Sequence, residues 1–321
     1  MMMNSRLALA ACALLLSGLV HAQGYPTRPI RVIVPYPPGG GVDIVMRAIQ
    51  PLLTERLGQT VVIDNRPGAT GAIGTELTAH ATPDGYTLLA HTSAGLTIVP
   101  HTLPQARFDV LKDFAPITQM TSAPFIFVVH PKVAATSVAQ LIALAKARPG
   151  ELNYASSGNG SSTHLAGLLL CKVAGVSMVH IPYKGSGPAT TDLLAGQVQT
   201  RFSSIPPALP HVKSGRLRAL ATTGARRFVL LPDLPTISET LPVYAVDSWY
   251  AVLAPAGTPP AILKKLNTEF AAALSSPEAK ARLRDDGVEA VGSTPQQLAA
   301  LMKTDLARWG PLVKEAGASS K

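Results

Sequence analysis

Two loops built from small residues have the composition of anion-binding loops. The first, "PPGGGVD" at residues 37–43, follows an apolar run and opens a segment that reads as a helix. Backbone N–H groups at a helix start have no intrahelical partner and carry partial positive charge, and glycine allows a ligand close to them. The pattern fits an anion cradle. It also fits a tight strand-to-helix turn in which Asp43 is a cap or brace.

The second loop, "ASSGNGSSTHLAG" at residues 155–167, repeats this arrangement in the middle of the chain. It offers hydroxyls, an amide and free N–H groups at a helix start expected near Ser161, with His164 in the first turn. The alternative is a serine-capped helix with a solvated histidine. Small ligands bind at the carboxyl ends of parallel strands, so two such loops together favour one shared binding site.

Further hydroxyl-bearing side chains lie at the ends of other strand-like runs or, for Thr70, in another glycine loop. They are Thr70, Thr92, Ser93, Tyr183, Ser203 and Ser204. Uncharged hydroxyls in these places suit hydrogen bonding to a ligand better than proton transfer.

The residues that catalysis needs are scarce. The chain has no G-x-S-x-G elbow and no H-E-x-x-H motif, and its eight histidines lack the spacing of metal ligands. Charged residues make up only 15% of the sequence, and few of them fall in the loops described above. We therefore expect a binding protein with no catalytic residues, no metal and no cofactor. A serine hydrolase that uses the loop at residues 156–164 is the enzymatic alternative.

Strand-like and helical segments alternate along most of the chain. Runs such as "IRVIVPY", "FIFVVHP" and "SWYAVLAP" are almost continuously apolar, which is typical of strands covered on both faces. The helical segment from Asp43 repeats apolar residues at helical spacing and stops at Gly58. This alternation predicts an α/β fold with mainly parallel sheets.

Two breaks in the alternation predict a division into two lobes. One falls at "ITQMTSAPF", where one strand run leads directly into another without an intervening helix, and the second falls near "LRALATTGARRF". The first lobe is then expected to comprise residues 23–120 and 223–321, and the second lobe residues 121–222. Two connections between the same lobes would form a hinge.

The first 22 residues have the features of a secretory signal peptide. A short cationic start and 14 apolar residues precede a small-residue cleavage site before Gln23. The alternative is a lipidated Cys12, from the lipobox-like "LAAC". After cleavage, Cys171 would be the only cysteine, which excludes an internal disulfide. The net charge of +9 is dispersed, which argues against nucleic-acid binding and fits either attraction of anionic solutes or general solubility.

Taken in order, several segments resemble the Bug family, the periplasmic substrate-binding proteins of tripartite tricarboxylate transporters. The resemblance rests on "YPTRPIRVIVPYPPGGGVDIVMR", "VVIDNRPGATGAIG", "TPDGYTLL", "LNYASSGNGSSTHLAG", "HIPYKGSGPATTDLLAGQV", "GRLRALATTGARR", "LPDLPTISE" and "SWYAVLAPAGTP". It extends from Tyr25 to about Gly317.

The resemblance implies a type II periplasmic-binding-protein fold, with two α/β lobes joined by a two-strand hinge. It implies a periplasmic monomer, not embedded in the membrane, that captures a small carboxylate and delivers it to large and small membrane permease subunits. A receptor that signals to a two-component system is the alternative.

The resemblance also implies ligand contacts from both lobes. In the first lobe these are Pro38, Gly39, Gly40, Gly41, Val42, Asp43, Thr70, Thr92 and Ser93. In the second lobe they are Ser156, Ser157, Gly158, Asn159, Ser161, Ser162, His164, Tyr183, Ser203 and Ser204. Two departures from the family pattern, "GLLLCKVAG" after the histidine and the third glycine of the first loop, leave the identity of the ligand open.

Overall fold

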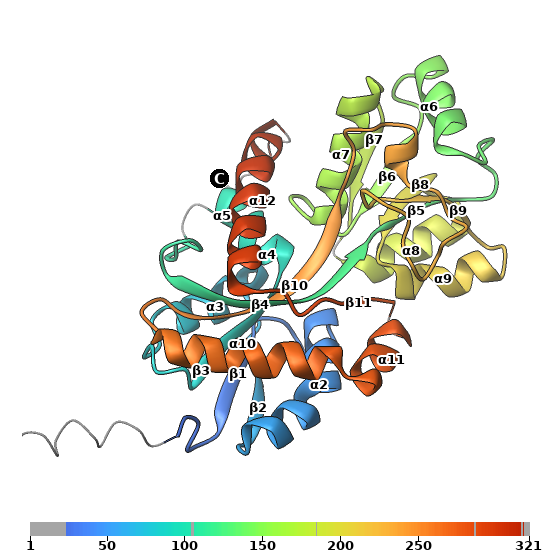
Figure 1. The fold of residues 1–321 in the computed structure, drawn as a ribbon. Coiled ribbons are helices and arrows are strands. Elements are labelled where there is room, and N and C mark those ends of the chain that lie inside the picture. The colour runs from blue at the N-terminus through green and yellow to red at the C-terminus, as the bar shows by residue number, and fades with distance from the viewer. Residues whose placement is uncertain (1–23, 104–105, 184, 286, 316, 318–321) are drawn as a thin grey trace, which may run out of the picture.

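The computed structural model describes residues 24–103, 106–183, 185–285, 287–315 and 317. The proposed signal peptide and Cys12 lie outside these residues. Two mixed β-sheets flanked by helices form two lobes (Figure 1). The first lobe contains both the first and the last described elements of the chain.

The first-lobe sheet has six strands in the order β11-β4-β10-β3-β1-β2. Their bounds are β1 Ile30–Val34, β2 Val61–Asn65, β3 Thr87–Thr92, β4 Phe114–Pro124, β10 Asp247–Pro255 and β11 Glu289–Ala290. The strands β1, β2 and β3 run parallel to one another, so β1 and β3 end at the same edge of the sheet.

The second-lobe sheet has five strands in the order β7-β6-β8-β5-β9. Their bounds are β5 Ile126–Val129, β6 Asn153–Ser156, β7 Val179–Pro182, β8 Thr200–Ser203 and β9 Arg218–Thr222. The strands β6, β7 and β8 are parallel, so their carboxyl ends also share one edge.

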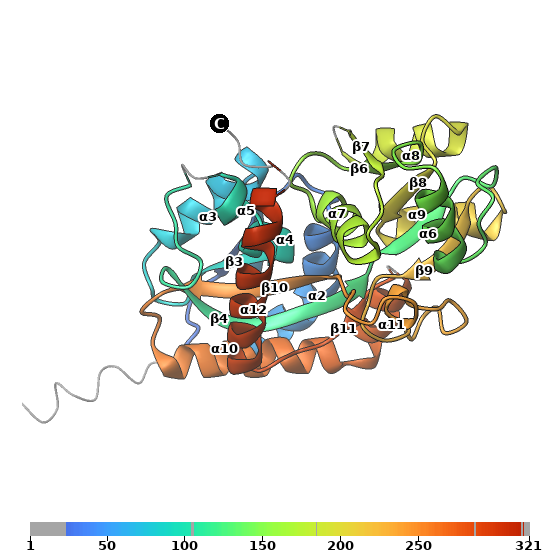
Figure 2. The ribbon, with the colours of Figure 1, turned by 90° about the horizontal axis from the view of Figure 1, so that it is seen from above.

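Two long strands of the first-lobe sheet link the lobes. Only Phe125 separates β4 from β5 of the second lobe, and the chain returns through β10, which pairs antiparallel with β4 from Asp247 to Pro255. The pairing is antiparallel because one strand leaves the lobe and the other enters it. Seen from above, the lobes lie side by side across these strands (Figure 2).

Helices cover both sheets. Those of the first lobe are α2 Gly41–Leu57, η1 Ala69–Gly71, α3 Ala72–Ala79, α4 Ser93–Thr97, α5 Val99–Thr102, α10 Pro260–Ser275, α11 Pro277–Asp285 and α12 Pro295–Glu315. Those of the second lobe are α6 Val138–Ala147, α7 Ser162–Ala174, α8 Ser186–Ala195, α9 Ile205–Lys213 and η2 Ile237–Glu239. None of the described helices is long and apolar enough to cross a membrane.

Helix α2 shows why these segments fold as the sequence predicts. Its buried residues, including Val45, Ile49 and Leu53, repeat at helical spacing and pack on the first-lobe core. The helix ends at Gly58, whose φ of 65° is the left-handed conformation that favours glycine.

The second connection between the lobes lies later than the expected boundary at residue 222. Phe228 packs in one core cluster of the second lobe, and Ile237, Tyr244 and Val246 pack in the other. The chain re-enters the first-lobe sheet only at Asp247, the first residue of β10. The first connection falls near the expected one, since β4 continues to Pro124.

Candidate functional site

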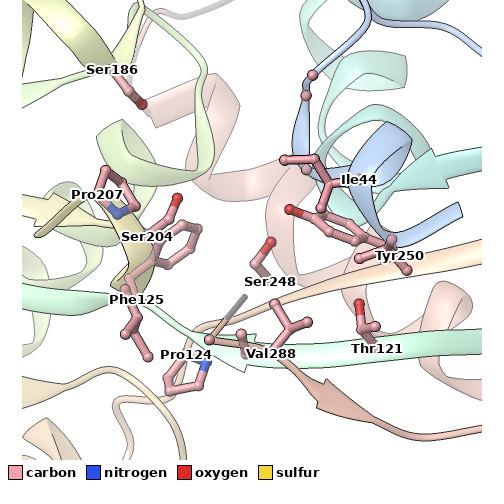
Figure 3. Close-up of a pocket in the computed structure, with 17 residues that line it drawn as sticks. Ile44, Thr121, Pro124, Phe125, Ser186, Ser204, Pro207, Ser248, Tyr250 and Val288 are labelled. Atoms are coloured by element: carbon pink, nitrogen blue, oxygen red, sulfur yellow. The ribbon is translucent and has the colours of Figure 1, made fainter. Parts of the chain in front are cut away.

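A cleft separates the two lobes. It consists of two adjoining cavities of about 470 and 400 Å³, which share Phe125, Ser186, Ser204, Ser248 and Tyr250 as lining residues. In Figure 3, Ser186, Ser204 and Phe125 lie on one side of the first cavity, Ile44 and Tyr250 on the other, and Ser248 rises from β10 between them.

The glycine loop before α2 forms one wall of the cleft. Gly39, Gly40 and Gly41 all line it, and α2 begins at Gly41. Gly39 has a φ of 80°, which only glycine adopts easily. At Gly41 a Cβ atom would stand 2.3 Å from the Tyr250 hydroxyl oxygen, so the third glycine allows α2 to approach the linking strand β10.

Asp43 supports this loop from inside the protein. Its Oδ2 accepts hydrogen bonds from the Gly39 N–H at 2.8 Å and Arg47 Nε at 2.9 Å, and its Oδ1 accepts one from Asn65 Nδ2 at 3.1 Å. Burial alone would raise the pKa of this carboxyl, but the hydrogen bonds from Arg47, Gly39 and Asn65 outweigh burial and lower it. Asp43 is 1% exposed and does not line the cleft. It braces the loop, and Gly40 rather than Asp43 occupies the cap position of α2.

A buried histidine holds the next part of the first-lobe wall. Thr75 Oγ1 donates to the Gly71 carbonyl, so His91 Nε2 carries the proton that Thr75 Oγ1 accepts at 3.0 Å. His91 Nδ1 then accepts the Thr92 N–H at 2.8 Å. Thr92 Oγ1, which lines the cleft, caps α4 and contacts the Tyr36 hydroxyl at 2.8 Å.

Thr70 reaches the cleft from η1. Its φ of 57° and ψ of 28° place a β-branched residue in the left-handed region, which is rare. Such backbone conformations cluster at functional sites, because the surrounding structure must hold them.

The second-lobe wall is organised around the hydroxyl of Thr163. Its Oγ1 accepts the Ser157 N–H at 3.0 Å and contacts the hydroxyls of Ser157 at 2.9 Å and Ser161 at 3.1 Å. Ser161 in turn caps α7 by accepting the His164 N–H at 3.2 Å. The loop is therefore held in one shape, with the start of α7 facing the cleft.

We expect Thr163→Val to lower the free energy of unfolding by about 1–3 kcal/mol, because it leaves the Ser157 N–H without its acceptor. Urea unfolding measures this loss. Thr191→Val is the matched control, since Thr191 Oγ1 donates only to the Gly187 carbonyl of its own exposed helix turn. Equal stability of the two variants would contradict the role given to Thr163.

Two stacked histidines support the same loop from the side away from the cleft. The rings of His164 and His180 are parallel, with centroids 3.7 Å apart. His164 Nδ1 accepts the Gly160 N–H at 3.1 Å, and His180 Nε2 lies 2.6 Å from Ser156 Oγ. Burial lowers the pKa of both, and that of His180 falls to about 4 through burial and the neighbouring His164.

The structure brings most of the sequence-predicted residues together at the cleft. Those that line it are Gly39, Gly40, Gly41, Thr70, Thr92, Ser157, Gly158, Asn159, Ser161, Ser162 and Ser204. Those that do not are Pro38, Val42, Asp43, Ser93, Ser156, His164, Tyr183 and Ser203.

The residues away from the cleft have other contacts or are buried. Val42 belongs to the core, and Ser93 Oγ accepts the Trp249 N–H at 3.3 Å. Tyr183 donates its hydroxyl to Asp192 Oδ2 at 2.6 Å, and its pKa rises to about 12 through desolvation and that carboxylate. Most of these side chains support the walls instead of facing the ligand space.

Several lining residues are not apparent from the sequence. The floor contains Thr121, Ser248 and Tyr250 from the linking strands β4 and β10, and Ser186 begins α8 on the second-lobe side. In β10 the lining residues Ser248 and Tyr250 are two apart and face the same side of the strand, as strand geometry requires. The sequence indicates that alternation but not which face meets the cleft.

The arrangement suits the binding of an anion without a counter-charge in direct contact. The starts of α2, α7 and α8 border the cleft, and each contributes N–H groups and the positive end of a helix dipole. Among the described lining residues, none has a charged side chain. Hydroxyls and backbone N–H groups are therefore the donors offered to a ligand.

The fold and cleft together define a two-lobed ligand-binding protein of the type II periplasmic-binding-protein class. Residues 45–318 match the family described as tripartite tricarboxylate transporter family receptor, TctC. The chain is 40% identical over 304 residues to Protein BugT of Bordetella pertussis, covering 94% of this chain and 93% of that protein. This protein therefore belongs to the TctC, or Bug, family of solute-binding receptors, as the sequence motifs predict.

Solved structures agree with this assignment. A Rhodopseudomonas palustris protein solved with adipate is 37% identical, with a TM-score of 0.79 over 92% of this chain and 99% of that one. MatC of Rhodopseudomonas palustris, solved with malate, is 31% identical, with a TM-score of 0.75 over 90% of this chain and all of that one. The predicted two-lobe α/β fold is confirmed.

Proposed function

We propose that this protein is a periplasmic receptor that closes its two lobes over a small carboxylate and delivers it to a tripartite tricarboxylate-type membrane transporter. The observation that carries the proposal is the cleft itself, in which three helix starts and a set of hydroxyls meet and none of the described lining residues is charged. The adipate and malate bound by the two similar proteins support a carboxylate as the ligand.

The residues proposed to hold the carboxylate come from both lobes. Gly40 and Gly41 would offer the start of α2, and Ser161 and Ser162 the start of α7. Charge-assisted N–H and O–H bonds contribute roughly 1.5–3 kcal/mol each, so a few of them suffice for tight binding without a salt bridge.

Closure follows from the same geometry. A ligand that touches both lobes binds the closed form better, and so shifts the equilibrium between open and closed forms toward closure. The crossings at Phe125 and between Val246 and Asp247 are the proposed hinge, because they alone connect the described parts of the two sheets along the chain. The closed form is what the permease subunits would recognise.

In this proposal the signal peptide directs export of the receptor to the periplasm and is then cleaved off after Ala22. The description of the matched family as transporter receptors supports this location. Cleavage would leave Gln23 as the first residue of the mature protein.

A thermal-shift screen of mono-, di- and tricarboxylates and amino acids tests the proposed ligand class. A carboxylate bound only by the folded protein should add about 2.7 kcal/mol to its stability at a hundredfold excess over Kd, which raises the midpoint by several degrees. Calorimetry then gives the affinity of each hit. If no carboxylate shifts the midpoint, the proposed function is wrong.

A further inference from the structure

A buried arginine lies directly behind the second-lobe wall of the cleft. Arg201 on β8 is 1% exposed, and its Nη1 donates a hydrogen bond to Thr190 Oγ1 of α8. Its Nε and Nη2 have no hydrogen-bond partner in the described part of the chain, and none of the ion pairs found there includes it. Leaving a buried guanidinium without a counter-charge is strongly unfavourable, which calls for an anion nearby.

The position of Arg201 points to the ligand space. In the sheet register Arg201 pairs with Ala155, one residue before the end of β6, and β8 itself ends at Ser203. The next residue, Ser204, lines the cleft. Strands rise about 3.3 Å per residue, so the Cα atom of Arg201 lies roughly 10 Å along the chain from that of Ser204.

Two hydrogen bonds connect the guanidinium to a second lining residue. Thr190 Oγ1, which accepts from Arg201, donates at 2.9 Å to the carbonyl oxygen of Ser186. Ser186 is the first residue of α8 and lines both cavities of the cleft. Ser203, two residues from Arg201 on the same face of β8, has a buried hydroxyl that also has no partner in the described chain.

The charge of Arg201 persists at neutral pH. Burial lowers the pKa of its guanidinium only to about 10. Because the lining side chains that the structure describes are uncharged, Arg201 adds a fixed positive charge to the wall made by Ser186 and Ser204.

We propose that Arg201 is the counter-charge for a second carboxylate of the ligand, bound at Ser186 and Ser204, and that the receptor therefore prefers dicarboxylates. This inference rests on the proposed function and adds the class of carboxylate. Arg201 is a positioning residue that acts from behind the wall. The first carboxylate binds at the starts of α2 and α7, where it depends much less on Arg201.

Matched ligand pairs test the inference. The probes are succinate, glutarate and adipate, each against its own monoamide, which keeps the length and removes one charge. In a partly buried site, one charge pair changes affinity by roughly tenfold to thirtyfold. Calorimetry on the wild-type protein should therefore give at least about tenfold tighter binding of the best dicarboxylate than of its monoamide.

Arg201→Met should reduce this preference to less than about threefold while changing the affinity for the monoamide little. Methionine is long and apolar and needs no partner, so the variant should fold. Arg201→Lys should retain most of the preference. Thr190→Val removes the link to Ser186 and should weaken the preference for the dicarboxylate. This variant provides a second test if Arg201→Met does not fold.

Arg218→Met is the matched control, because Arg218 lies on β9 with its Nη1 bonded to the carbonyls of Val133 and Ala135.

The possible outcomes separate the two proposals. An unchanged preference in Arg201→Met, or an equal loss in Arg218→Met, overturns the inference and leaves the proposed function intact. Tighter binding of monoamides, or binding of monocarboxylates alone, has the same consequence. If no carboxylate binds the wild-type protein, the proposed function fails together with the inference.

Discussion

Replacing Gly40 with leucine is expected to weaken ligand binding about a hundredfold or more without unfolding the protein. The backbone permits the change, because Gly40 has a φ of −73° and a ψ of 160°, which any residue adopts. A Cβ atom there would stand 3.8 Å from Tyr36 Cβ and 3.3 Å from the Pro37 carbonyl oxygen, which would have to move by a few tenths of an ångström. The leucine side chain would fill the space in front of α2 and prevent a carboxylate from making two or more charge-assisted hydrogen bonds with the N–H groups there.

The neighbouring glycines should behave differently. Gly41→Ala would bring a Cβ atom against the Tyr250 hydroxyl, and an alanine in place of Gly39 would be strained at a φ of 80°. Both variants should therefore lose stability, whereas Gly40→Leu should cost less than about 1 kcal/mol as an unfavourable cap residue.

Gly40→Ser is the matched control for size, because serine is favoured at a helix cap and leaves most of the cleft open. Calorimetry with the best carboxylate of the thermal-shift screen measures affinity, and thermal unfolding without ligand measures stability. If Gly40→Leu bound as tightly as the wild-type protein, the glycine loop would not contact the ligand.

The parts of the fold that depend on local patterns were predictable. Continuous apolar runs marked most of the strands, and Gly58 marked the end of α2. The loops at residues 37–43 and 155–167 were placed correctly at strand ends because their composition is local information. The segment at residues 223–246 was assigned to the wrong side of the boundary, since its place depends on Phe228 and Tyr244 packing on a sheet far away in sequence.

The roles of individual site residues required the three-dimensional structure. Thr163 and His164 are adjacent in the sequence, yet Thr163 lines the cleft and His164 stacks on His180 behind it. The floor residues Ser248 and Tyr250 reach the cleft only because β10 pairs with β4 in one register. Arg201 lies in a strand-like run, and nothing in the sequence shows that two of its guanidinium nitrogens lack a hydrogen-bond partner in the described part of the chain.

His91 makes the first-lobe wall sensitive to acid. Burial lowers the pKa of this imidazole from 6.5 to about 3, and its Nδ1 must stay unprotonated to accept the Thr92 N–H. The neutral form is thus favoured in the folded protein, so its contribution is complete above the unfolded pKa of about 6.5. Stability is lost as the pH falls from there toward 3, by at most about 1.4 kcal/mol per pH unit.

We therefore expect His91 to account for about 2–3 kcal/mol of lost stability between pH 7 and pH 4.5. His91→Gln should lower stability at pH 7 because it disturbs the bonds to Thr75 and Thr92, but it should flatten the pH dependence by that amount. Urea unfolding gives the free energy of unfolding of both proteins at the two pH values. Comparing the change with pH in the variant with that in the wild-type protein removes the contribution of titrating groups that the two proteins share.

His80→Gln is the control, because His80 is exposed at the end of α3 and its ring bonds only to the Glu76 carbonyl of the same helix. An identical pH dependence in His91→Gln and the wild-type protein would show that folding does not require a neutral His91. A flattened profile would instead locate the acid sensitivity of the first-lobe wall in the hydrogen bond that fixes Thr92 at the edge of the cleft.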